Sequence, residues 1–356
     1  MRRRLGLLLA VLLLLLLGGD FALWRHTVSE LRARLEIWRT QRAGEGWIVD
    51  HGVTVAGGWP FRVALTVNDL SVRGGTAFVP GGLSWSADRL VLGLSPLRPR
   101  TLQLSADGTQ KLRFGSGPAI TGTADFARLD ITTREDGRIQ DLSAEVVKLS
   151  AAFVPAFAGR GATAAPVRYL TIGAARANGS LISVPADGEA PVTLAVSAET
   201  IVLPEGTRWP LGPRIATAAV EGTLQGTWPG GENLAARAAA WRDGGGSLEI
   251  QRFQLGWGPL VLAAGATLAL DDQLQPMGAG TGKLTGYAAT LDALAANAVL
   301  TRSAVTAAKA VLSLMAGPAA DGDPVEVEVP LTLQYRTLSM RQVPLLRLPE
   351  IDWPPP

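Results

Sequence analysis

The chain contains no cysteine. Disulfide bonds, thiolate metal ligands, a thiol nucleophile and the acylated cysteine of a lipoprotein are therefore excluded, and the redox compartment is left open. Histidine is almost as scarce, because only His26 and His51 occur and they are well separated. Two separated histidines do not supply the cluster that a transition-metal site needs.

Lysine is scarce too, so arginine supplies almost all of the positive charge. Lysine occurs only at 111, 148, 283 and 309, and the net charge of all 356 residues is +2. Even this small excess belongs to one segment: residues 1–42 hold eight arginines and three acidic residues, whereas the remainder holds 25 basic and 28 acidic residues, a net charge of −3. Such a body lacks the basic surface that nucleic-acid binding requires, so we expect no nucleic-acid partner.

Motifs that carry catalysis are missing as well. The chain has no H-E-x-x-H, G-x-S-x-G, Walker A, dinucleotide-binding or EF-hand pattern. The pair Asp271–Asp272 is a poor acid–base pair, because neighbours on a strand point to opposite faces, and a hairpin turn explains it better. The stretch Asp321–Asp323 is more typical of a turn than of a calcium loop. We therefore expect a protein that is not an enzyme, without catalytic residues, cofactor or metal.

Apolar residues, in contrast, are abundant, and they dominate the N-terminus. Arg2, Arg3 and Arg4 precede a run of Leu, Gly, Ala and Val, and Phe21–Trp24 extends this run to the length that spans a bilayer. An uncut anchor over 1–24 and a cleaved signal peptide are the competing interpretations. No A-x-A site follows the run, so we favour the anchor. The positive-inside rule then places the arginines in the cytoplasm and the bulk of the chain in the periplasm of a bacterial inner membrane.

The next segment, 25–45, keeps a helical pattern, with Leu31, Leu35 and Trp38 on one side, until Gly44 and Gly46 end it. This juxtamembrane helix is expected to lie against the first strands. Binding of anionic lipid headgroups by its arginines is the alternative.

From 46 to 356 the periodicity changes from helical to alternating. Val63, Leu65 and Val67 alternate with more polar residues, and VTLAVSA (192–198) and VEVEVPLTLQY (325–335) repeat the pattern. Clean alternation indicates an antiparallel sheet with one apolar and one wet face. Pro330 within the last of these stretches suggests an edge or bulged position.

The expected fold is mainly β with some α: an N-terminal anchor helix and a large, twisted and curved antiparallel sheet, half-barrel or groove-like. An alanine-rich pattern over 287–316 predicts one long C-terminal helix packed on this sheet. A subdivision of the β-domain near 228–246 is the alternative to a single unit, because that segment breaks the strand texture.

Two short stretches are candidates for a groove or a corner of the sheet. One is GGWPFR, with Gly58, Trp59, Pro60 and Phe61; the other consists of Trp257, Gly258 and Pro259. Glycine and proline there favour a corner or bulge. Tryptophan in a sheet usually packs in the core, and the functional alternative is an apolar groove for a lipid or another amphiphile.

Three blocks in order resemble the domain-of-unknown-function family 2125 of bacterial envelopes. They are GWIVDHG with GGWPFRVAL, the stretch WRDGGGSLEIQRFQLGWGPLVLAAGATLALDDQLQPMG, and the alanine-rich helix leading into VEVEVPLTLQYRTLSMRQVPLLRLP. The resemblance covers nearly the whole chain and implies no activity. The texture of the middle block is also similar to AsmA-type envelope proteins, which form long β-grooves linked to lipid homeostasis.

The sequence thus predicts a non-enzymatic, membrane-anchored periplasmic protein of envelope homeostasis that binds or shields a lipid or amphiphile in an apolar β-groove. The first alternative is an interaction module that binds envelope proteins through its sheet edges. The second is a hydrolase of envelope polymers, which needs a cleft of catalytic groups that the sequence does not reveal.

Overall fold

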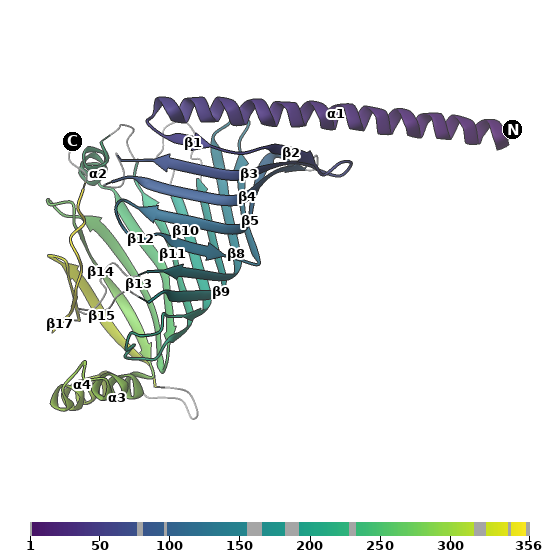
Figure 1. Cartoon of the computed structure of the whole chain (residues 1–356). Helices are drawn as coiled ribbons and strands as arrows, with labels where there is room; N and C mark the ends of the chain where they lie inside the picture. Colours follow the sequence, from purple (N-terminus) through teal and green to yellow (C-terminus); the bar gives the residue numbers. More distant parts are fainter. Residues whose placement is uncertain are drawn as a thin grey trace.

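The computed structural model describes residues 2–76, 81–95, 98–154, 166–181, 192–227, 233–316, 325–340 and 343–353. Within these ranges the chain forms one large antiparallel sheet with helices at its ends (Figure 1). Trp228 and the Asp321–Asp323 stretch lie outside the described residues.

The first element is a single helix, α1 (Arg2–Gly44). At 1.5 Å per residue its 43 residues span about 65 Å. Its C-terminal half lies along the first strands, whereas its N-terminal half projects beyond the sheet (Figure 1). Gly46, with a φ of +80°, follows the helix and turns the chain into the first strand. The two expected segments, 1–24 and 25–45, are therefore one continuous helix.

Within the described ranges, seventeen strands make up the sheet. The first nine are β1 (Ile48–Asp50), β2 (Thr54–Gly57), β3 (Val63–Gly74), β4 (Leu83–Ser95), β5 (Arg98–Phe114), β6 (Ile120–Thr123), β7 (Phe126–Thr133), β8 (Ile139–Phe153) and β9 (Arg168–Leu181). The others are β10 (Val192–Val202), β11 (Arg214–Gln225), β12 (Ser247–Trp257), β13 (Leu260–Leu270), β14 (Pro276–Thr285), β15 (Val327–Gln334), β16 (Thr337–Met340) and β17 (Val343–Arg347).

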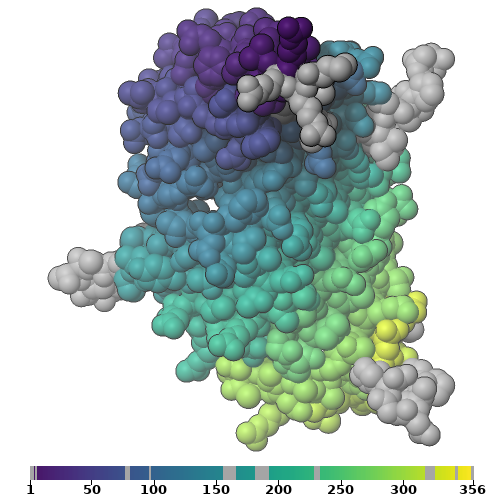
Figure 2. Space-filling view, turned by 90° about the vertical axis from the view of Figure 1, so that its right-hand side faces the viewer, coloured from purple at the N-terminus to yellow at the C-terminus, as the bar shows by residue number. Residues whose placement is uncertain are grey.

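The sheet is a meander in which neighbours in the chain are neighbours in space. Strand β3 pairs with both β1 and β2 on one side and with β4 on the other. Strand β5 pairs with β6 and β7, which both pair with β8, and from β8 to β17 each strand pairs with the next. All described pairings are antiparallel, as expected. The surface colours accordingly pass from purple at α1 to yellow at the other end (Figure 2).

The C-terminal half of α1 packs on one side of the sheet. Val28 and Leu31 are buried against Leu65 and Val67, two of the least exposed side chains of β3. Trp24 and Leu35 complete this stripe, whose spacing of three and four residues places all four helix side chains on one face. The expected contact of Leu31 and Leu35 is confirmed. Trp38 is not part of this core, and its side chain is 37% exposed.

The predicted C-terminal helix packs on the sheet but consists of two helices, α3 (Tyr287–Ala296) and α4 (Arg302–Met315). The chain breaks between them because Ala298 adopts a φ of +56° and Thr301 caps α4, its side chain accepting a hydrogen bond from the Ala304 N–H. Val305 and Leu312 of α4 are buried against Val327 and Val329 of β15, in the second core of the protein.

The remaining helix, α2 (Leu234–Asp243), occupies the described part of the segment 228–246. Strands β11 and β12, on either side of it, pair directly with each other, so the sheet continues across this segment. Pro330 of β15 pairs with β14 on one side, and the pairing of β15 with β16 begins only at Leu331. Residue 341, which would face Pro330 on the β16 side, lies outside the described residues, so the edge or bulged position of this proline stays a prediction.

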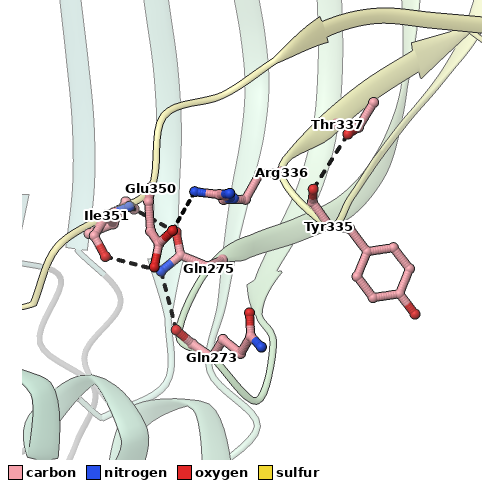
Figure 3. A network of polar contacts seen from close by, with 7 residues as sticks. All are labelled: Gln273, Gln275, Tyr335, Arg336, Thr337, Glu350 and Ile351. Atoms are coloured by element: carbon pink, nitrogen blue, oxygen red, sulfur yellow. Dashed lines mark hydrogen bonds and ion pairs between the residues drawn. The ribbon is translucent and has the colours of Figure 1, made fainter.

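The C-terminal tail is fixed to the turn between β13 and β14 (Figure 3). The side chain of Gln275, which is 4% exposed, donates to the Ile351 carbonyl at 3.1 Å and accepts from the Ile351 N–H at 2.9 Å. Arg336, in the turn after β15, reaches the Glu350 carboxylate at 2.6 Å. These contacts hold the end of the chain across the edge of the sheet. In the turn between β13 and β14, Asp271 Oδ1 accepts hydrogen bonds from the backbone N–H groups of Gln273 and Gln275. This confirms that Asp271 and Asp272 belong to a hairpin turn.

The contact between α1 and β3 leads to a stability prediction. Replacing Leu65, which is fully buried, with alanine leaves a cavity and should lower the free energy of unfolding by about 2–5 kcal/mol. Chemical denaturation of the detergent-solubilised full chain, followed by tryptophan fluorescence, measures this loss. Thr66→Ala is the matched control on the other side of β3 and should cost less than about 1 kcal/mol. Equal losses in the two variants would contradict the assignment of the core.

Candidate functional site

One side of the sheet is apolar from end to end. Directly paired residues of antiparallel strands project to the same side, so the register shows which side chains share a face. One row of paired residues crosses twelve strands without a polar side chain: Leu65, Leu92, Leu104, Leu129, Ala144, Ala177, Val196, Val220, Phe253, Ala264, Gly282 and Val329. We call the side of the sheet that carries this row the apolar face.

The next row along the same face repeats the pattern. It consists of Val63, Leu94, Leu102, Ile131, Leu142, Gly179, Leu194, Gly222, Ile250, Ala266, Gly280, Leu331 and Met340. Both rows lie on the side that α1 and α4 cover, because Leu65 and Val329 belong to the two cores. The apolar face therefore connects the two cores.

The opposite side, which we call the polar face, has a different chemistry. The row that alternates with the first one includes Arg128, Glu145 and Arg176 on three successive strands. Arg176 lies 3.1 Å from Glu145, and Arg128 binds both carboxylate oxygens of Asp130 at 2.7 and 2.8 Å. That hydrogen bond, together with the nearby charges of Asp130 and Glu145, raises the pKa of Arg128. These ion pairs are typical of a solvated surface.

Single-residue interruptions keep the apolar side chains on one face. In β8 the next side chain on the apolar face after Val146 is that of Leu149, and in β10 the next one after Ala198 is that of Ile201. Strict alternation would send the second member of each pair to the polar face. Lys148 and Thr200, at the interruptions, adopt left-handed φ angles of +50° and +53°. This conformation turns the strand and restores the apolar side.

The cover over the apolar face is incomplete. Leu65 and Val329 at the two ends are 0% and 1% exposed, whereas Leu142, Leu194 and Val196 in the middle are 37%, 52% and 39% exposed. Among the described elements, only α1, α3 and α4 make substantial contacts with the sheet besides strand neighbours. Strands β8–β12 therefore present aliphatic side chains that no described element buries.

The sheet folds toward the apolar face at β13 and β14. Gly278 and Gly280 lie on this face, and a Cβ atom at these positions would be 2.1 Å and 2.3 Å from the carbonyl oxygens of Thr267 and Gly265. So close an approach to the neighbouring strand is possible only for glycine, and it means that the two strands bend inward on this side. The curved, groove-like sheet is thereby confirmed, with the apolar face on the inside of this bend.

Two shallow hollows lie on the polar face. The larger, of about 530 Å³, spans β8–β12, and its lining includes the polar residues Ser143, Asn178, Thr223 and Gln251 together with Leu142 and Leu194 of the apolar rows. Ser143 and Gln251 donate hydrogen bonds to Asn178 and Thr223, so these lining groups satisfy one another. The smaller, of about 300 Å³, lies over β3–β5 next to Phe61. Within the described ranges no group of three His, Asp or Glu side chains is placed to hold a metal ion.

The predicted residues Gly58, Trp59, Pro60 and Phe61 form the turn between β2 and β3. Gly58 has a φ of +91°, its carbonyl accepts the Arg62 N–H at 3.0 Å, and the Trp59–Pro60 peptide bond is cis. This is the geometry of a corner, and it lies against α1. Trp24 Nε1 donates to the Gly57 carbonyl at 3.2 Å, and the ring of Phe21 meets that of Trp59 edge-on at 5.8 Å.

Trp257 is the last residue of β12, and Gly258 and Pro259 form the turn between β12 and β13. The side chain of Trp257 lies on the apolar face and donates to the Gly212 carbonyl at 2.8 Å. A Cβ atom on Gly258 would meet the Leu211 carbonyl oxygen at 2.4 Å, so this turn packs closely on the loop after β10. The register places it at the strand end opposite to the β2–β3 turn. The two candidate stretches are thus not brought together, and a ligand role for either stays a prediction.

Sequence reasoning did not single out Leu194 and Val196, which are exposed in the middle of the apolar face. The alternation of VTLAVSA places them on one side of β10. The alternation along one strand does not reveal that eleven other strands continue the same row, because this depends on the register between strands.

The described part of the chain is thus a β-sheet protein with one apolar face. It is preceded by an N-terminal helix that is long and apolar enough to cross a membrane. The chain belongs to the family DUF2125, described as uncharacterized protein conserved in bacteria, which matches residues 24–349. The match begins where α1 reaches the sheet and includes all seventeen strands. The comparison with curated proteins gives no match, and the comparison with solved structures gives none either.

The left-handed residues offer a test of how the apolar face is kept continuous. A β-branched residue at a φ of +53° is strained, so Thr200→Gly should raise the free energy of unfolding by about 1 kcal/mol. Glu199→Gly, one residue away with an ordinary φ, should lower it by about 0.5–1 kcal/mol. Chemical denaturation of the two variants measures both changes. A loss of stability in Thr200→Gly would show that the interruption is not a site of strain.

Proposed function

We propose that this protein is a non-enzymatic membrane-anchored protein whose apolar face holds the acyl chain of a lipid or a similar amphiphile. In this proposal α1 spans the bacterial inner membrane, the sheet lies in the periplasm, and the protein serves envelope homeostasis. The observation that carries the proposal is the unbroken row from Leu65 to Val329, open over β8–β12.

The physical argument starts from the cost of exposing that face to water. Each square ångström of apolar surface removed from water contributes about 25 cal/mol. A soluble protein normally covers such a face with a second layer of helices or strands. Here the described elements cover only its two ends, so an aliphatic ligand on the middle strands would bury surface that the fold leaves exposed. The wide, continuous lining suits an extended chain better than a compact polar metabolite.

The position of the anchor supports the same function. α1 continues without interruption from its apolar N-terminal half into the half that packs on β3. The apolar face therefore begins beside the helix that would lie in the membrane. An amphiphile that leaves the bilayer next to α1 meets apolar side chains at once, and its headgroup remains in water at the strand ends.

A photo-crosslinking experiment tests this proposal. The full chain is produced in cells with a benzophenone amino acid in place of Leu194 or Val196, on the apolar face, and in place of Ala195 or Ser197, on the polar face of the same strand. After irradiation, intact-protein mass spectrometry should detect lipid adducts at 194 and 196 and none at 195 and 197. Equal adduct formation on both faces, or none on either, would overturn the proposal.

A charge placed on the apolar face gives an independent prediction. Leu194 is 52% exposed, so Leu194→Glu should leave the free energy of unfolding within about 1 kcal/mol of the parent value. The same charge should abolish the lipid adduct at 196, because an ionised carboxylate beside an acyl chain loses its hydration. Ala195→Glu, which carries the charge to the polar face, should leave the adduct unchanged. Retention of the adduct in Leu194→Glu would argue against an aliphatic ligand there.

A second candidate function rests on the free edge of the sheet. Among the described strands β17 pairs only with β16, and its Leu345 and Leu346 are 52% and 55% exposed. Such an edge can take up a strand of a partner envelope protein. The same crosslinking amino acid at Leu345 would then yield a protein adduct, whereas Leu194 would yield no lipid.

A further inference from the structure

The β2–β3 turn displays apolar side chains that the core does not use. Phe61 is 88% exposed and Trp59 is 42% exposed. Large aromatic side chains exposed together at the tip of a turn need a reason other than folding. These side chains lie next to α1.

The turn lies at a defined height along α1. Trp24 Nε1 donates to the Gly57 carbonyl at 3.2 Å, and the rings of Phe21 and Trp59 are 5.8 Å apart. The turn thus lies beside the part of α1 from which the helix projects beyond the sheet (Figure 1). If α1 crosses a membrane, the depth of Phe21 and Trp24 relative to that membrane therefore also fixes the depth of the turn.

That depth follows from the geometry of the helix. From Leu5 to Trp24 the helix rises about 30 Å, the thickness of the hydrocarbon core of a bilayer. Phe21 and Trp24 then lie at the boundary between hydrocarbon and headgroups, where aromatic residues gather in membrane proteins. Because Trp59 contacts Phe21, it lies at the same boundary.

The charges around the turn fit this environment. Arg25 on α1 and Arg62 at the end of the turn are exposed, and neither forms an ion pair with another described residue. Cationic side chains beside aromatic rings match the phosphate layer of a bilayer, whose headgroups are negatively charged. An acidic surface would be expected to repel the same membrane.

We propose that the β2–β3 turn, Gly57–Arg62, is a second membrane-contact site, which places Trp59 and Phe61 in the interfacial layer of the phospholipid bilayer that α1 crosses. This inference rests on the part of the proposed function that places α1 in the membrane. It adds a structural consequence. With two contacts, the sheet cannot rotate freely about its anchor, and the strand ends that carry Val63, Leu94 and Leu102 are held at the membrane surface.

The absence of cysteine makes a direct test available, because any introduced cysteine is the only one. Three single-cysteine variants of the full chain carry an environment-sensitive fluorophore: Phe61→Cys in the turn, Leu12→Cys within the apolar segment, and Leu314→Cys on α4. Leu314 is the matched control, since it is 87% exposed and belongs to the opposite end of the fold. Each variant is reconstituted into vesicles of phosphatidylethanolamine and phosphatidylglycerol that contain lipids with a nitroxide near the headgroup or deep in the acyl chain.

The label at position 61 should show a blue-shifted emission and lose fluorescence to the shallow nitroxide, and the label at 12 should lose it to the deep one. The label at 314 should be unaffected by either. If the label at 12 is quenched while that at 61 behaves like that at 314, α1 spans the membrane and the second contact does not exist. If the label at 12 is not quenched, the anchor and this inference fail together. Neither result depends on the lipid adducts at Leu194, so a failure here is distinguishable from a failure of amphiphile binding.

Discussion

The pairing of each strand with the next one in the chain is the constraint on which the rest of the structure depends. Antiparallel pairing transmits side-chain direction from strand to strand, so one apolar position in β3 fixes the face of its partners as far as β15. A slip of one residue at any pairing would send every later apolar side chain to the polar face. The left-handed residues Lys148 and Thr200 accept backbone strain because they keep this direction constant where the alternation skips a residue.

Much of the fold could be predicted from the sequence because its signals are local. The alternation of Val63, Leu65 and Val67 indicates a strand with one apolar face, and the apolar run before Trp24 indicates the helix. The break between α3 and α4 was missed, since alanine-rich sequence favours a helix on both sides of Ala298 and only the cap at Thr301 marks the restart. The order and the register of the strands were not predicted, because they depend on contacts between strands that no single segment encodes.

In the candidate site, too, local features could be predicted from the sequence and contacts between distant segments could not. Gly58–Phe61 could be recognised as a corner, because glycine and proline restrict the backbone in ways that neighbouring residues do not alter. Its contact with Phe21 and Trp24 joins segments more than thirty residues apart in the sequence, as the hydrogen bond from Trp24 to Gly57 shows. The open middle of the apolar face was equally out of reach, because exposure at Leu194 depends on what the rest of the chain fails to cover.

The distribution of the helices explains why the sheet stays open. A meander this long could bury its apolar face by closing on itself or by adding a second layer. Instead α1 covers β3 and α4 covers β15, so the two cores lie at the ends of the sheet and include no side chain of β8–β12. In the proposal that this face holds an amphiphile, the ligand would lie on strands outside both cores, so its binding and release would not require either core to open.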